Sequence, residues 1–257
     1  MSLLEQGGEM ARRSILQTLR QPAMVIPPIL FPLTLMAINV GGLDAATMLP
    51  GFPADSYLDF AIAFPFIQGS LFAAINAGSS LARDVETGFI KRLAMTPMRR
   101  SALLIGQLLG SMTVAFFSAF VYLAAGFVAG MDFKSGALGV PTIILLGVLI
   151  ALGFAGIGAY IGLRSGSGEA VQGFFPLLFV LLFLSSVNLP RNLIEQDWFR
   201  TIATYNPVSY LVEGVRSLII TGWDEEALAL GFGLAVVMAT VSITLASTAL
   251  RTRLIRT

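Results

Sequence analysis

Long apolar runs separated by short polar segments dominate the hydropathy pattern of this chain. Each run is close to the length of about 20 residues that a helix needs to cross the hydrocarbon core of a bilayer. The runs stay apolar along their whole length instead of alternating, which favours helices over the strands of a membrane barrel. We therefore expect an all-α integral membrane protein. Its six transmembrane helices are expected at about residues 23–43, 58–82, 102–130, 139–163, 170–189 and 227–249.

The distribution of charge predicts the orientation of these spans. Only 12% of the residues are charged, against about 25% in soluble domains. If both termini share one side, that side has twelve of the sixteen Lys and Arg residues: Arg12, Arg13, Arg20, Arg83, Lys91, Arg92, Arg99, Arg100, Arg164, Arg251, Arg253 and Arg256. The other side has Lys134, Arg191, Arg200 and Arg216. Because cytoplasmic loops carry the excess of basic residues, we expect cytoplasmic termini and a multi-pass protein of the inner (plasma) membrane.

The polar segments suggest three features of a single transmembrane domain covering residues 1–257. Residues 1–22 lack the pattern of a secretory signal and are expected to form an amphipathic helix on the membrane surface. Residues 83–101 form a basic segment, placed by the charge count in the cytoplasm, and 190–226 form the largest outer segment.

The cytoplasmic segment 83–101 has the pattern of a short amphipathic helix. Glu86 and Gly88 precede the apolar positions, and Pro97 is expected to end the helix because its ring is incompatible with the preceding turn. The apolar side consists of Phe89, Ile90, Leu93 and Ala94. Glu86 could bind a basic residue of a partner or favour a helix N-terminus; the sequence leaves both open.

In the outer segment, Asn206 and Pro207 are expected to start a helix of about 13 residues that ends near Gly222. This helix is too short to span, so we expect a re-entrant helix that dips into the outer leaflet. Glu213 and Arg216 are spaced for a local ion pair. A direct contact of these two residues with a substrate is the alternative.

Small and polar residues inside the spans indicate close packing. The pairs Gly106/Gly110, Gly126/Gly130 and Gly158/Gly162 permit close approach of helices, within one subunit by preference or across a dimer. Asn39, Gln68, Asn76, Gln172 and Asn188 are expected to face protein or a transport path. Pro27, Pro28, Pro32, Pro65 and Pro176 can kink their helices.

Several functions are disfavoured by what the sequence lacks. Histidine and cysteine are absent, which removes the usual Ser–His dyad and the common zinc ligands. No GxxxxGK[S/T] phosphate loop occurs, so ATP hydrolysis by the P-loop route is excluded. Carboxylates are scarce in the spans, which disfavours a proton relay. We expect no catalytic residue, metal or cofactor in this chain.

Two stretches carry a resemblance to a known family. ETGFIKRLAMTPMRRSALLIGQLLG (86–110) and NPVSYLVEGVR (206–216) resemble the two signatures of type-2 ABC exporter permeases. Among these, the chain is similar to the membrane subunits of daunorubicin and other drug-resistance exporters. The length, the six expected spans and the cytoplasmic termini agree with this family.

The resemblance implies a permease subunit driven by a separate ATPase. In this family the cytoplasmic coupling helix docks on the ATPase, which binds ATP and Mg. Two ATPase chains work with two permeases, either two copies or a copy and a paralogue. The implied docking residues are Glu86, Gly88, Phe89, Ile90, Leu93, Thr96 and Pro97, and the outer motif is Asn206, Pro207, Tyr210, Glu213 and Arg216.

The implied activity is export of a drug-like, lipidic or glycan substrate by alternating access. The partners would be the ATPase, the second permease, the lipid bilayer and a hydrophobic or amphiphilic substrate, with no nucleic acid. A secondary, non-ATP multidrug transporter and an intramembrane enzyme are the alternatives.

Overall fold

A computed structural model describes residues 8–9, 11–16, 20–95 and 100–255, and within these residues all regular secondary structure is helical. Residues 11–16 form part of a helix that precedes α2. The α-helices that follow are α2 (Pro22–Leu43), α3 (Tyr57–Ala61), α4 (Ala63–Glu86), α5 (Phe89–Ala94), α6 (Arg100–Val128), α7 (Gly136–Ser165), α8 (Gly168–Phe183), α9 (Asp197–Tyr205), α10 (Pro207–Ile220) and α11 (Glu225–Ile255). Two 3-10 helices, η1 (Asp44–Met48) and η2 (Arg191–Leu193), lie in the connections.

Five segments of the described chain are long and apolar enough to cross a membrane: Pro22–Met48, Tyr57–Glu86, Leu103–Val128, Gly136–Ser165 and Glu225–Arg253. The fifth expected span, 170–189, corresponds to α8, which has only 16 residues. At 1.5 Å per residue α8 is about 24 Å long, shorter than a hydrocarbon core of about 30 Å. The chain is thus an integral membrane protein, and the count of six spans stays a prediction.

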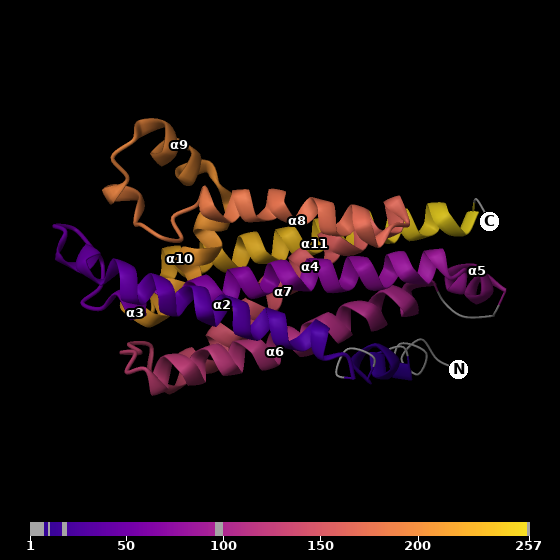
Figure 1. The fold of residues 1–257 in the computed structure, drawn as a ribbon, viewed down its shortest axis with the longest axis horizontal. Coiled ribbons are helices and arrows are strands. Elements are labelled where there is room, and N and C mark those ends of the chain that lie inside the picture. The colour runs from indigo at the N-terminus through magenta and orange to yellow at the C-terminus, as the bar shows by residue number, and fades with distance from the viewer. Residues whose placement is uncertain (1–7, 10, 17–19, 96–99, 256–257) are drawn as a thin grey trace.

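The long helices form an elongated bundle whose two ends differ (Figure 1). Both chain termini and α5 lie at one end, whereas α3, α9 and α10 lie toward the other. Among the described segments that carry basic residues, the N-terminal helix, α5 and the C-terminal part of α11 lie together at one end of the bundle. Which end faces the cytoplasm stays a prediction from the charge count.

The closest helix packing in the bundle is between α4 and α7. A Cβ atom built on Gly158 would lie 2.7 Å from Cα of Ala74, and one built on Gly162 would lie 3.0 Å from Cα of Gly78. Side chains at either position would collide with the α4 backbone, so the glycines allow the two helices to touch. This glycine pair acts within one subunit, as we preferred from the sequence.

The expected single helix over 83–101 is wrong in its boundaries. Helix α4 continues to Glu86, and Gly88 then adopts a left-handed conformation with φ of 69°. A left-handed glycine just after a helix ends that helix, so α5 starts separately at Phe89 and α6 already begins at Arg100. Thr96 and Pro97, at the expected helix end, lie outside the described residues.

Candidate functional site

Helix α5 packs against the rest of its own chain. Ile90 is only 3% exposed and belongs to a buried cluster with Leu81, Leu103 and Leu104, against which Phe89 also packs. The expected direct contact of Ile90 with a partner is therefore wrong, because its side chain is part of this core. The side chain of Leu93 is not described.

An arginine from the N-terminal helix connects α4 to α5. The Arg13 guanidinium lies 3.3 Å from the buried Asp84 carboxylate of α4 and 4.2 Å from the centre of the Phe89 ring of α5. A cation over an aromatic face is stabilising by about 0.5–2 kcal/mol, more when desolvated. The sequence did not indicate this cluster, because Arg13 is 71 or more residues away from Asp84 and Phe89 along the chain. The one signal was an aspartate beside an apolar span, since a buried carboxylate requires a partner.

Glu86 contacts the start of α8. Its Oε1 accepts a hydrogen bond from the backbone N–H of Gly168, at 3.3 Å. The first N–H groups of a helix have no partner within it, and a carboxylate there is favourable. Of the two roles left open for Glu86, the structure therefore shows the stabilisation of a helix N-terminus. The helix concerned is α8 and not α5.

The exposed side of this region is basic. Thr87, Lys91 and Arg92 are exposed, and Met95 is 89% exposed. We call Lys91 and Arg92 of α5, together with Met95 just after the helix, the α5 outer face. It lies at the end of the bundle that has both termini (Figure 1).

At the opposite end, Asn206 starts α10 as expected. Its side-chain oxygen accepts from the N–H of Val208 at 2.9 Å, and Pro207 is the first helical residue. The side-chain amide of Asn206 also donates to the carbonyl oxygen of Leu181 on α8, at 2.7 Å. One residue thus caps α10 and fixes it to α8. The helix ends at Ile220, before Gly222 with its φ of 91°.

Arg216 of α10 is buried and bonded to backbone. Its guanidinium donates to the carbonyl oxygens of Phe60 (3.1 Å), Ser186 (3.1 Å) and Val187 (2.9 Å), and lies 3.4 Å from the centre of the Phe60 ring. A buried charge is stable only when it is paired or hydrogen-bonded. Arg216 of α10 therefore connects its own helix to α3 and to the segment after α8.

Glu213 pairs with Arg191, so the expected ion pair between Glu213 and Arg216 is wrong. Arg191 donates from Nε to Glu213 at 2.7 Å and also from Nη2, and the Ser186 hydroxyl donates to the same carboxylate at 2.9 Å. The Arg191 guanidinium lies 4.5 Å from the centre of the Tyr210 ring. The hydrogen bond to Glu213 raises the pKa of Arg191, which keeps this arginine charged.

These outer residues border a cavity of about 420 Å³. Its lining includes Arg191, Asn192, Glu213, Arg216 and Asp224. The two arginines and two carboxylates balance in charge, so the cavity has no net preference for an anion or a cation.

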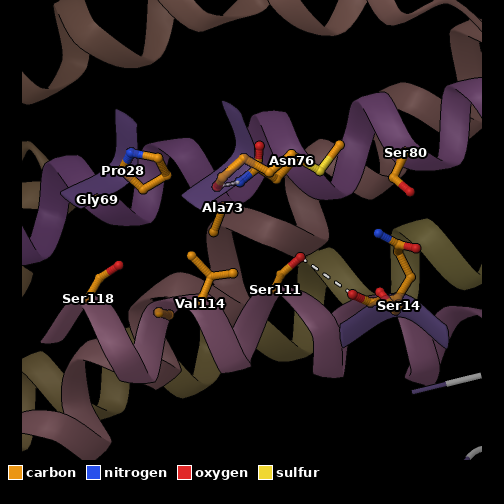
Figure 2. A pocket seen from close by; sticks show the side chains of 12 residues that line it. Ser14, Pro28, Gly69, Ala73, Asn76, Ser80, Ser111, Val114 and Ser118 are labelled. Atoms are coloured by element: carbon orange, nitrogen blue, oxygen red, sulfur yellow. Dashed lines mark hydrogen bonds between the residues drawn. The ribbon is translucent and has the colours of Figure 1, made fainter. Parts of the chain in front are cut away.

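A second, much smaller pocket lies within the bundle between α2, α4 and α6 (Figure 2). Its volume of about 10 Å³ is close to the space of one water molecule, whereas pockets for drug-sized ligands are about 300 Å³ or more. The lining is unusually polar for a membrane interior and includes Ser14, Asn76, Ser80, Gln107, Ser111 and Ser118.

Within the described residues, no group of three or more Asp and Glu side chains is arranged to bind a metal ion. The candidate functional site therefore consists of the contacts between helices at the two ends of the bundle, around α5 at one end and around α10 at the other.

Comparison with known proteins identifies the family. Residues 5–220 match the family model of the ABC-2 type transporter. The chain is 26% identical over 227 residues to the daunorubicin resistance ABC transporter permease protein DrrB1 of Streptomyces coeruleorubidus, covering 86% of this chain and 77% of that protein. It is 28% identical over 224 residues to the putative transport permease ycf38 of Pyropia yezoensis, covering 84% and 75%.

A third relative is the probable doxorubicin resistance ABC transporter permease protein DrrC of Mycobacterium tuberculosis, at 27% identity over 158 residues. This match covers 61% of the chain and 55% of the relative. The family match spans most of the chain and includes both signature stretches. The chain therefore belongs to the ABC-2 type transporter family and is the membrane-spanning permease subunit of an ABC exporter.

Proposed function

We propose that a separate ATPase docks on the α5 outer face and drives export through this chain. The observation that carries the proposal is the division of α5 into two sides. Phe89 and Ile90 pack on the subunit core, while Lys91, Arg92 and Met95 are exposed. A short helix that is anchored on one side and free on the other can pass a displacement from a bound partner to the helices behind it.

The contacts behind α5 support this role. Arg13 binds Asp84 and lies over Phe89, while Glu86 contacts the start of α8. A displacement of α5 would therefore reach the N-terminal helix, α4 and α8 together. In the proposed complex both termini are cytoplasmic, two ATPase chains bind ATP and Mg, and a second permease, a copy or a paralogue, completes the path.

The outer helices are proposed to cap that path from the other side. α10 is a 14-residue helix anchored by Arg216 and Asn206, and we assign it as a re-entrant helix. Two relatives are named for resistance to daunorubicin and doxorubicin, which favours a drug-like, amphiphilic substrate for this chain. Lipids and glycans are the competing substrate classes, and stimulation of ATPase activity by each class in the reconstituted complex would separate them.

The docking proposal is tested by reversing charge on α5. Lys91→Glu combined with Arg92→Glu should reduce co-purification of the co-expressed ATPase at least about tenfold and abolish transport. The control is Arg251→Glu, which reverses the charge of an exposed arginine in the C-terminal part of α11; this part of α11 lies at the same end of the bundle as α5 (Figure 1). Equal loss in the control would indicate a general charge effect, and normal ATPase binding by the double variant would refute docking on α5.

A further inference from the structure

The prolines of α2 leave carbonyl groups without their usual partners. In an α-helix the N–H of each residue donates to the carbonyl four residues earlier, and proline has no N–H. Pro28 therefore frees the carbonyl of Met24, and Pro32 frees the carbonyl of Pro28. Within a bilayer no water is present to satisfy these groups, and each one left unpaired is costly.

Side chains from two other helices bind these two carbonyls. Asn76 of α4 donates from Nδ2 to the Met24 carbonyl at 3.0 Å, and the hydroxyl of Tyr122 of α6 donates to the Pro28 carbonyl. A Cβ atom on Gly69 would lie only 3.2 Å from carbons of the Tyr122 ring. The tyrosine thus reaches α2 by passing α4 at a residue without a side chain.

Figure 2 shows the surroundings of these bonds: Pro28, Gly69 and Asn76 lie along one side of the small polar pocket, and Ser111 and Ser118 lie along the other. Tyr122 lines an adjoining pocket that it shares with Ser118. If the two bonds to α2 open, the released amide and hydroxyl have polar neighbours available.

The other contacts of α2 within the subunit are apolar, such as those of the Phe31 ring with Phe72 of α4 and Phe179 of α8, and most of the helix surface is not covered by them. Only 17% of the most apolar stretch of the α2 span is buried inside the subunit, against 83% of the corresponding stretch in the span that contains α4. Its buried residues form one narrow stripe, Pro28, Pro32 and Met36, while Ile26, Leu30 and Ile38 are more than half exposed. The two hydrogen bonds are therefore directional contacts on a helix whose apolar contact with the subunit is narrow.

We propose that Asn76 and Tyr122 are positioning residues of the transport cycle, which fix the proline-containing half of α2 on α4 and α6 in one conformation and release it in another. α2 follows the N-terminal helix, whose Arg13 contacts Asp84 and the Phe89 ring of α5. Displacement of α5 thereby opens the two bonds. This inference rests on the proposed function for its driving force, but the bonds themselves are tested without the ATPase.

The first experiment measures the position of α2 in the isolated permease. The chain has no cysteine, so spin labels at Ile26→Cys on α2 and Phe117→Cys on α6, both exposed, report one distance in nanodiscs. A hydrogen bond contributes about 1 kcal/mol, and 1.4 kcal/mol is tenfold in an equilibrium. Tyr122→Phe and Asn76→Leu should each increase the population with displaced α2 about fivefold.

The controls make the same chemical changes elsewhere. Tyr160→Phe removes a hydroxyl from α7, and Asn39→Leu removes an amide from α2 itself, beyond the proline segment. Gly69→Ala is a second route to the same state, because the added methyl displaces Tyr122 while both hydrogen-bond donors remain. The proposal is overturned if the three test variants Tyr122→Phe, Asn76→Leu and Gly69→Ala all give the same distance distribution as the two control variants.

The second experiment uses the complete complex and separates positioning from general stability. Release of α2 should raise basal ATP hydrolysis while transport per ATP falls at least about threefold, whereas loss of stability would lower both activities together. Variants that displace α2 but keep normal coupling would refute a role in the cycle. If the ATPase fails to bind at α5, the docking proposal fails, and the distances in the isolated permease still decide the role of Asn76 and Tyr122.

Discussion

Gly158→Ala should destabilise the protein although alanine is the better helix former. The added methyl would lie 2.7 Å from Cα and 2.5 Å from the carbonyl carbon of Ala74 on α4. Carbon atoms in ordinary contact are about 3.5–4.0 Å apart. Helices α4 and α7 must therefore separate locally by about 1 Å, and contacts along their shared surface are lost.

The expected net effect is the difference of two contributions. Overpacking in a well-packed interior costs about 1–3 kcal/mol, while replacing glycine by alanine within a helix returns up to about 1 kcal/mol. We expect the free energy of unfolding to fall by about 1–2 kcal/mol for Gly158→Ala. Gly41→Ala on α2 is the matched control, because nothing lies within 4 Å of its added methyl; it should be neutral or stabilising.

The two variants can be compared by reversible unfolding in mixed micelles with increasing dodecyl sulfate, followed by far-ultraviolet circular dichroism. The unfolding midpoint of Gly158→Ala should lie at a lower dodecyl sulfate fraction than that of wild type, and the midpoint of Gly41→Ala should be unchanged or higher. A Gly158→Ala protein as stable as Gly41→Ala would mean that α4 and α7 are not in backbone contact at this position, and the packing argument would be wrong.

Two further predictions concern the outer helices and the orientation. Arg216→Met removes the donor of three charge-assisted hydrogen bonds to backbone carbonyls and should lower the unfolding free energy by about 3–5 kcal/mol, since each such bond contributes about 1.5–3 kcal/mol. Arg191→Gln at the half-buried pair with Glu213 should cost only about 1 kcal/mol, and equal losses in the same unfolding assay would contradict the assigned burial. An impermeant thiol reagent added to intact cells should label Tyr205→Cys, since the native Tyr205 is 83% exposed. The same reagent should leave Thr87→Cys unlabelled although Thr87 is also exposed, and the reverse pattern would invert the proposed topology.

The sequence was sufficient for the features that depend on neighbouring residues. Apolar runs predicted the long helices, and Asn206 followed by Pro207 predicted the start of α10. Even Gly158 and Gly162, as a spaced pair, indicated close packing. In each case the physical cause, such as burial of an apolar length or capping of a helix, acts over a few residues of chain.

The sequence was insufficient where tertiary contacts compete with local ones. Glu213 and Arg216 have ideal spacing on one helix, yet Glu213 binds Arg191 and Arg216 binds carbonyls of distant segments. Ile90 has the pattern of an exposed docking face, but it is buried on its own subunit. The roles of Asn76 and Tyr122 follow from carbonyls freed on α2, and nothing in the sequence says which helices pack there.

The left-handed residue Gly88 has a consequence for how such permeases acquire new partners. It separates α5 from α4, so the outward positions 91, 92 and 95 are not part of any spanning helix. Under the proposed docking mode, substitutions at these three positions alter recognition of an ATPase, while Phe89 and Ile90 keep the subunit interior unchanged. Duplicated exporters can therefore diverge in partner choice through very few substitutions, without a compensating change in the membrane.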